Sequence, residues 1–98
     1  MLLYRYSGQD EMIIGMPERG RAQEGCEEVV GYFINMLPIR SAGIGTQSLL
    51  TLSRALQLTM ADALDHAAYP FALMARELEL VPGEDFTPVF QVAFEYQN

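Results

Sequence analysis

The sequence predicts an α/β domain in which a mixed β-sheet is flanked by helices. Three observations indicate this class: apolar segments rich in β-forming residues near the N-terminus, a long amphipathic pattern in the middle, and an alternating segment at the end. The 98 residues suffice for one small domain, or part of one, and two independent cores would not fit. We therefore expect residues 1–98 to form a single unit.

The N-terminal segment predicts the end of a helix, a strand and a loop. Residues 2–7 have helical character, and Gly8 stands where a left-handed helix cap is expected. Residues 11–16 form a short apolar run that predicts a buried strand. Residues 17–28 are polar and predict a loop.

Two further segments predict strands in different environments. Residues 29–40 are almost all apolar and predict a strand buried on both faces, with a bend at Gly31 and an edge position for Pro38. Residues 86–96 alternate between apolar and polar side chains, which predicts a strand with one solvated face. Three strands leave sheet edges open, so we expect one piece of a larger sheet.

The middle of the chain predicts two helices separated by a proline. Apolar side chains recur every three or four residues from about residue 46 to 67, and Thr46 or Ser48 can cap the start. Pro70 cannot continue this helix, so it ends the first and opens a second that finishes near Leu80.

Composition excludes several classes of protein. The net charge is −7 and there is no lysine, which argues against nucleic-acid binding because that requires clustered cations. No apolar run reaches the roughly 18–20 residues of a membrane helix, and the N-terminus does not resemble a signal peptide, so we expect a cytoplasmic protein. One cysteine and one histidine cannot build a disulfide or a thiolate metal cage.

Three groups of residues have the composition of reactive sites, and each has a plainer interpretation. Residues 43–48 resemble a glycine-rich phosphate loop, although a turn with a helix cap is favoured. Asp62 and His66 share a helix face and could hold a metal, but a carboxylate–imidazole hydrogen bond near the helix end, or the helix dipole acting on His66, is favoured, and we expect no metal. Cys26 could pair with His66 as a nucleophile, yet no elbow motif surrounds it.

The neighbouring acids are interpreted in the same way. They could act as acid and base, but adjacent carboxylates usually mark a solvated loop. The two pairs are Glu27 with Glu28 and Glu84 with Asp85.

Asn35 is the strongly polar side chain within an otherwise apolar run. A buried amide without partners costs about 1–3 kcal/mol, so it must be satisfied. Two interpretations stay open: the amide bonds to the backbone of a neighbouring loop, or it faces a polar cavity.

Four segments together resemble the condensation domains of nonribosomal peptide synthetases. Residues 30–40 are similar to the family's motif of glycine, aromatics, asparagine and a closing arginine. Residues 66–71 resemble its His-x-x-aromatic-Pro-Phe motif, and residues 88–94 resemble its Pro-Leu-Phe-Gln segment. Residues 6–15 add a fourth matching stretch. The order and spacing agree over almost the whole chain.

The resemblance implies part of a chloramphenicol acetyltransferase-like lobe, the C-terminal one of two. The complete family domain joins an aminoacyl or peptidyl thioester to an amine, and both are carried on the phosphopantetheine arms of carrier proteins. The implied partners are those carriers and the remainder of the domain, and no cofactor is bound directly. The family's catalytic His-His motif is absent from this sequence, so the chain alone is not expected to catalyse condensation.

The resemblance also implies roles for individual residues. Asn35 matches an asparagine on the tunnel side of the family's active site and is our candidate tunnel residue. Arg40 matches the motif's arginine, interpreted as an ion-pair partner. The residues that carry the structural motifs are Gly31, Phe33, Arg40, His66, Pro70, Phe71 and Phe90.

Two alternatives remain open at this stage. The chain could be a non-catalytic module that binds a carrier protein or another synthetase domain, although its acidic balance disfavours an acidic carrier surface. It could also belong to an epimerisation or heterocyclisation domain of the same superfamily.

Overall fold

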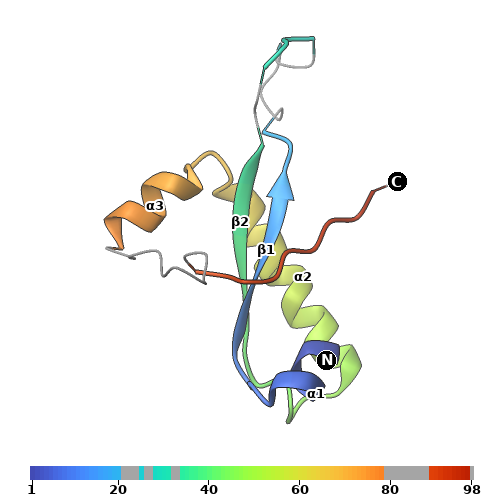
Figure 1. The fold of residues 1–98 in the computed structure, drawn as a ribbon. Helices are drawn as coiled ribbons and strands as arrows, with labels where there is room; N and C mark the ends of the chain where they lie inside the picture. Colours follow the sequence, from blue (N-terminus) through green and yellow to red (C-terminus); the bar gives the residue numbers. More distant parts are fainter. Residues whose placement is uncertain (21–24, 26–27, 32–33, 79–88, 98) are drawn as a thin grey trace.

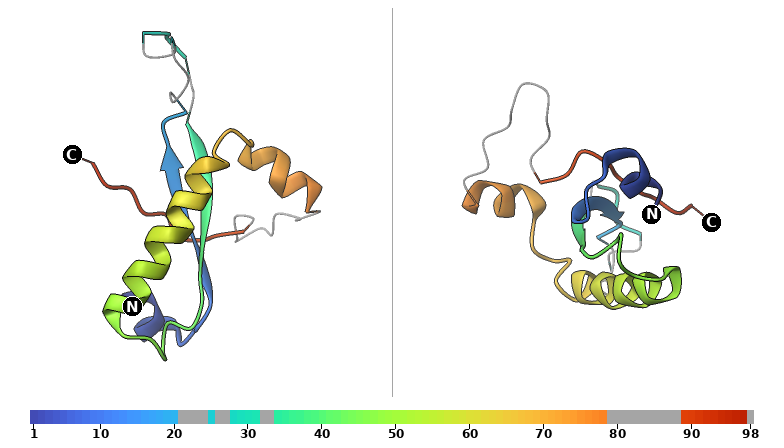
Figure 2. Two further views of the ribbon diagram at one scale, coloured as in Figure 1. Left: turned by 180° about the vertical axis from the view of Figure 1, so that it is seen from behind. Right: turned by 90° about the horizontal axis from the view of Figure 1, so that it is seen from below.

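The computed structural model describes residues 1–20, 25, 28–31, 34–78 and 89–97 (Figure 1). The helices and strands are, in order, α1 (Leu2–Ser7), β1 (Met12–Glu18), β2 (Asn35–Ser41), α2 (Leu49–Asp65) and α3 (Phe71–Glu77). β1 and β2 pair, α2 covers one face of the pair, and the C-terminal segment crosses the opposite face (Figure 2). α3 stands to the side of β2 (Figure 1).

The sheet is mixed, as the sequence predicts. β1 and β2 are antiparallel, with Gly15 opposite Pro38 and Pro17 opposite Met36. A parallel bridge joins Gly15 to Ala93 on the other side of β1. β1 is therefore flanked on both sides, by β2 and by the C-terminal segment, which makes a single bridge to it.

The two prolines stand where the ladder between β1 and β2 needs no N–H group. The Gly15 N–H donates to Val92 O at 2.9 Å, and the Phe94 N–H donates to Gly15 O at 2.8 Å. Both backbone groups of Gly15 thus point away from β2, so the Gly15–Pro38 pair is the non-hydrogen-bonded type. The nitrogens of Pro38 and Pro17 point outward for the same reason, and neither breaks the pairing.

This geometry corrects two predicted strand boundaries. β1 continues through Pro17, where the sequence predicted a loop, because an outward proline nitrogen is tolerated. β2 begins at Asn35 rather than at residue 29, because β1 ends at Glu18, the partner of Asn35. Val30 is fully exposed, so burial on both faces is wrong for the start of this segment.

The predicted strand over residues 86–96 is wrong in extent. Residues 86–88 lie outside the described part, and within residues 89–97 only Ala93 forms a bridge. Residues 91–97 are exposed at both parities, so the expected single solvated face is not observed either. On the outer side of the segment no described strand is available to complete a ladder.

The helices follow the predicted pattern with shorter ends. Gly8 caps α1 in the left-handed conformation, with φ 70°. Ser48 caps α2, because its hydroxyl accepts from the Thr51 N–H at 3.2 Å. α3 ends at Glu77, and the end near Leu80 cannot be compared because that residue lies outside the described part.

The core lies between β2 and α2. Its buried apolar side chains are Leu37, Ile39, Ile44 and Leu52. Odd-numbered residues of β2 face α2, whereas Pro38 and Gly15 face the other side. There the Phe90 ring covers Gly15 so closely that a Cβ would overlap the ring.

We expect Gly15→Ala to lower the free energy of unfolding by about 1–3 kcal/mol, because an added methyl group overpacks against the Phe90 ring. Urea denaturation followed by circular dichroism measures this change. The control makes the same substitution in a Phe90→Ala background, where the cost should shrink because the ring is absent. An equal cost in both backgrounds would contradict the packing argument.

Candidate functional site

Asn35 joins β2 to the connection between α2 and α3. Its Nδ2 group donates to Ala67 O at 3.0 Å and to Tyr69 O at 2.8 Å. Its Oδ1 accepts from the Phe71 N–H at 2.9 Å. The side chain is half-buried, and three hydrogen bonds to backbone groups engage both its donors and its acceptor.

One of these bonds caps the N-terminus of α3, which has no capping side chain of its own. The N-cap position of α3 is Pro70, whose side chain offers no hydrogen-bond acceptor, and no side-chain cap is present there. Asn35 supplies the missing acceptor from 36 residues earlier in the chain. A single amide thus fixes the direction in which α3 leaves the corner.

Beside this corner lies an open groove of about 860 Å³. It runs along the outer edge of β2, between the C-terminal half of α2 and α3. Its walls are mainly apolar, with Pro38, Phe71 and Met74 among them. Such a groove can enclose an apolar chain or ligand, and polar groups near its rim can orient what enters.

The rim carries a hydrogen bond between Tyr69 and Glu77. The Tyr69 hydroxyl donates to the Glu77 carboxylate. This bond raises the pKa of Tyr69 above its ordinary value, with burial and the charge of Glu77 acting in the same direction. Tyr69 therefore stays protonated across the physiological range and acts as a hydrogen-bond donor.

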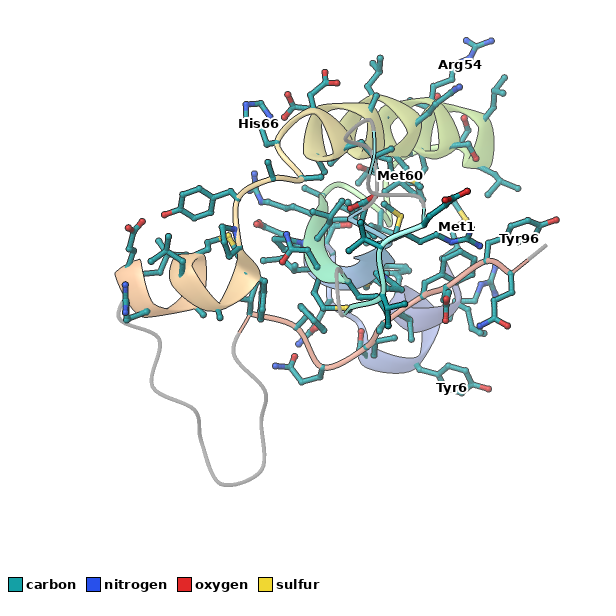
Figure 3. The ribbon with its side chains drawn as sticks, turned by 90° about the horizontal axis from the view of Figure 1, so that it is seen from above. Met1, Tyr6, Arg54, Met60, His66 and Tyr96 are labelled. Atoms are coloured by element: carbon teal, nitrogen blue, oxygen red, sulfur yellow. The ribbon has the colours of Figure 1, made fainter. Side chains whose placement is uncertain are left out.

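His66 ends α2 and is mostly exposed (Figure 3). Its Nδ1 lies 2.9 Å from Asp62 O and 3.8 Å from an Asp62 carboxylate oxygen. The hydrogen bond to the backbone carbonyl, followed by the charge of Asp62, raises the pKa of His66 above 6.5. The ring thus bonds to the backbone carbonyl at the helix end, and the expected hydrogen bond to the Asp62 carboxylate is not formed. Within the described residues, no three side chains from His, Cys, Asp or Glu gather as metal ligands.

Arg40 forms an ion pair across the sheet. Its Nε lies 2.5 Å from Glu11 Oε1, and both side chains are more than half exposed. The hydrogen bond and the charge of Arg40 hold the pKa of Glu11 below its ordinary value, and Glu11 raises the pKa of Arg40. The pair connects the end of β2 to the residue before β1.

The structure brings some motif residues together and separates others. Asn35, Pro70 and Phe71 meet at the corner, and the Phe71 and Phe90 rings pack with centroids 5.4 Å apart. Arg40 and His66 line the groove beside the corner, and neither bonds to Asn35 in the described part of the chain.

The described residues do not place the other sequence candidates at this site. Gly31 lies at an exposed bend before β2. Phe33, Cys26, Glu27, Glu84 and Asp85 lie outside the described residues, and Glu28 is exposed.

The glycine-rich turn before α2 is occupied by groups of the chain itself. The Gly45 N–H donates to the Asp10 carboxylate at 2.6 Å, and the Tyr4 hydroxyl leaves no room for a Cβ on Gly45. A carboxylate at this position repels a phosphate. The turn is therefore a structural link between α1 and the start of α2.

Sequence reasoning missed Tyr69 with Glu77, and Asp10 with Gly45. Tyr69 and Glu77 are eight residues apart across a proline, so a helical spacing rule does not connect them. Asp10 meets Gly45 across 35 residues, a contact that depends on the whole fold.

No helix among the described residues has the length and apolar character needed to cross a bilayer.

We expect Asn35→Asp to destabilise the chain at neutral pH by about 1–3 kcal/mol, because a carboxylate would face the Ala67 and Tyr69 carbonyls that now accept hydrogen bonds. The new carboxyl's folded pKa would be raised, so the loss should be full above that folded pKa and shrink as the pH falls through it toward the unfolded pKa of about 3.9. A residual loss should remain at low pH, because the protonated carboxyl donates one hydrogen bond where the amide donates two. Unfolding curves between pH 3 and 7 measure this. Gln57→Glu, on the exposed face of α2, is the matched control; an equal effect there would contradict the prediction.

The raised pKa of His66 gives a second prediction. Its contribution to stability is fully present below the unfolded pKa of about 6.5 and is lost as the pH rises through the higher folded pKa. An NMR titration of the imidazole protons should give a midpoint above 6.5. Asp62→Asn should lower it only in part, because the backbone carbonyl remains, and Asp65→Asn should lower it least. A midpoint at or below 6.5 would contradict the assignment.

Comparison of the sequence with known proteins identifies a family. The family model described as "Condensation domain" matches residues 1–98. Polyketide synthase PksN of Bacillus subtilis (strain 168) is 48% identical over 98 residues, which are 100% of this chain and 2% of that protein. A component of the linear gramicidin synthase of Brevibacillus parabrevis is 40% identical over 97 residues, 99% of this chain and 1% of that protein.

Solved structures agree with the fold. A holo four-domain nonribosomal peptide synthetase bound to AMP and glycine matches with a TM-score of 0.92 and 20% identity, over 98% of this chain and 7% of that one. A mutant starter condensation domain of rhizomide synthetase, in complex with C8-CoA and Leu-SNAC, matches with a TM-score of 0.84 and 25% identity. That match covers 95% of this chain and 21% of the domain's chain. The chain spans a small share of every relative named here. The match over residues 1–98 shows that it belongs to the condensation domain family.

Proposed function

We propose that this chain forms part of a domain that makes amide bonds between thioester-bound acyl groups and amines. The observation that carries the proposal is the family match over residues 1–98, which includes the segment where Asn35 holds the α2–α3 corner. The acyl and amine partners would be carried on the phosphopantetheine arms of carrier proteins in a cytoplasmic synthetase. The four-domain synthetase with the same fold supports this assignment.

The reaction itself is a transfer of an acyl group. The amine nitrogen forms a bond to the thioester carbonyl carbon while the carbon–sulfur bond breaks. The sulfur leaves with the bonding electrons and receives the proton that the nitrogen releases, so the products are an amide and a free thiol. Positioning two tethered reactants is a large part of the catalysis such a step requires.

The chain's own residues would position rather than react. We propose Asn35 as a positioning residue that sets the wall of the substrate tunnel through the α2–α3 corner. Its three hydrogen bonds to backbone groups support this role. His66, the one histidine of the sequence, is exposed and bonded to its own helix, so the reactive imidazole would come from the rest of the domain.

The 98-residue chain alone should form no amide from carrier-bound aminoacyl thioesters, because it lacks the paired histidines that the family resemblance implies. Mass spectrometry of the reaction mixture measures the product. Turnover by the purified chain would contradict the assignment of the imidazole to another part of the domain.

A hybrid tests the positive half of the proposal. Residues 1–98 replace the matching segment in the starter condensation domain of rhizomide synthetase, and C8-CoA with Leu-SNAC are the substrates. We expect the C8–leucine amide above the level of the hybrid with Asn35→Ala, and little change with Gln57→Ala. A folded hybrid without amide formation would refute the proposal. Equal rates for the two substituted hybrids would refute the role of Asn35.

A further inference from the structure

Helix α2 carries leucines on two sides. Leu52 faces the core between β2 and α2 and is buried. On the outer side Leu50, Leu58 and Leu64 are exposed by 62%, 74% and 48%. No described segment covers this side, because α2 lies on the outside of the molecule with the sheet on one side only (Figure 2). A helix that is apolar beyond its core-facing stripe presents a surface that suits a second partner.

One stripe along this outer side has a pattern that matches its own reverse. Its members recur every three or four residues and are all exposed: Thr51, Arg54, Leu58, Ala61 and Asp65. Such spacing keeps residues on one face and is typical of two helices that pack at a shallow angle. Arg54 stands four residues before Leu58, and Asp65 stands four residues after Ala61. Reversing the helix therefore exchanges the cation with the anion while the apolar pair stays in the middle.

The two charges of the stripe specify what can cover it. Neither Arg54 nor Asp65 forms an ion pair with another described residue, and Arg54 points away from the rest of the molecule (Figure 3). They are eleven residues apart, about 16 Å along the helix axis. A partner must therefore offer an anion and a cation at that separation, with an apolar stretch between them. A second α2 that runs in the opposite direction offers all three.

We propose that α2 pairs antiparallel with α2 of a second copy of this chain. Leu58 of each copy packs against Ala61 of the other. Arg54 of each copy lies opposite Asp65 of the other, and two-fold symmetry makes every contact occur twice. The leucines supply the apolar contact, whereas the exposed charges select the direction. In a parallel pair the like charges would meet instead.

This pairing does not use the groove beside α3. The residues of α2 that line the groove are Thr59, Asp62, Ala63 and His66, and none belongs to the stripe. The inference is therefore separate from the proposed function, and it brings two grooves into one assembly.

Sedimentation equilibrium of the 98-residue chain tests the pairing. We expect a concentration-dependent dimer with twice the mass of one chain, weakened by salt because the paired charges are screened. Arg54→Glu puts like charges opposite each other and should raise the dissociation constant at least about tenfold. Adding Asp65→Arg to that variant restores opposite charges in the antiparallel pair and should restore the dimer. Arg5→Glu, the same change of charge on the exposed surface of α1, is the control and should leave the constant unchanged.

Three results with the chain would overturn the proposal. One is a chain that stays monomeric up to about 1 mM, where even a weak interface forms. Another is a dimer that Arg54→Glu leaves intact, because the contact would then lie on a different surface. The third is a double variant that stays monomeric, because the antiparallel direction would then be wrong.

The hybrid described above tests whether the outer side of α2 stays free in a complete domain. We expect the hybrid to form a dimer, and Arg54→Glu to return it to a monomer without changing the rate of amide formation. A hybrid that makes the amide but stays monomeric would show that the rest of the domain covers α2, and would overturn the pairing alone. A hybrid that forms the dimer but no amide retains the pairing and refutes the proposed function.

Discussion

The hydrogen bonds of one side-chain amide determine how β2 meets the connection between α2 and α3. Asn35 stands at the first residue of β2, and its donors and acceptor reach three backbone groups between Ala67 and Phe71. Pro70 makes this arrangement necessary, because it offers α3 no cap of its own. The direction of α3, and with it the wall of the groove, depends on this contact. An amide suits the task because it supplies two donors and an acceptor, whereas a hydroxyl has one donor and a carboxylate has none.

Gly15 and the prolines of β1 and β2 determine on which side each strand can pair. The backbone of Gly15 bonds to the C-terminal segment, which turns the nitrogen of Pro38 outward and leaves β1 and β2 paired without loss. The same glycine lets the Phe90 ring lie directly on the sheet, and that ring contacts Phe71 of α3. The register of one hairpin thus connects the sheet, the C-terminal segment and the helix corner.

The sequence predicted those features of the fold that depend on residues close together in the chain. The α2 periodicity, the Ser48 cap and the Gly8 turn follow from neighbouring residues, and the structure has all three. The limits of a strand depend on its partner strand. The apolar pattern therefore predicted a β2 that starts too early, at residue 29, and the proline at position 17 predicted a β1 that ends too early. The partners of the Asn35 amide were left open because they come from 32 to 36 residues away, a relation that no period in the sequence encodes.

The chemistry of the described residues suits positioning rather than reaction. His66 is held by its own helix, Arg40 is paired with Glu11, and the Tyr69 hydroxyl is bonded to Glu77, so each of these polar groups near the groove already has a partner. A nucleophile or general base needs a lone pair that is free to react with the substrate. Side chains that are already hydrogen-bonded are instead held in fixed positions. Rigidity is itself useful where two tethered reactants must meet, because misplacement by about 1 Å can cost two orders of magnitude in rate. A wall held in place in this way is what the proposed function requires of the groove and its corner.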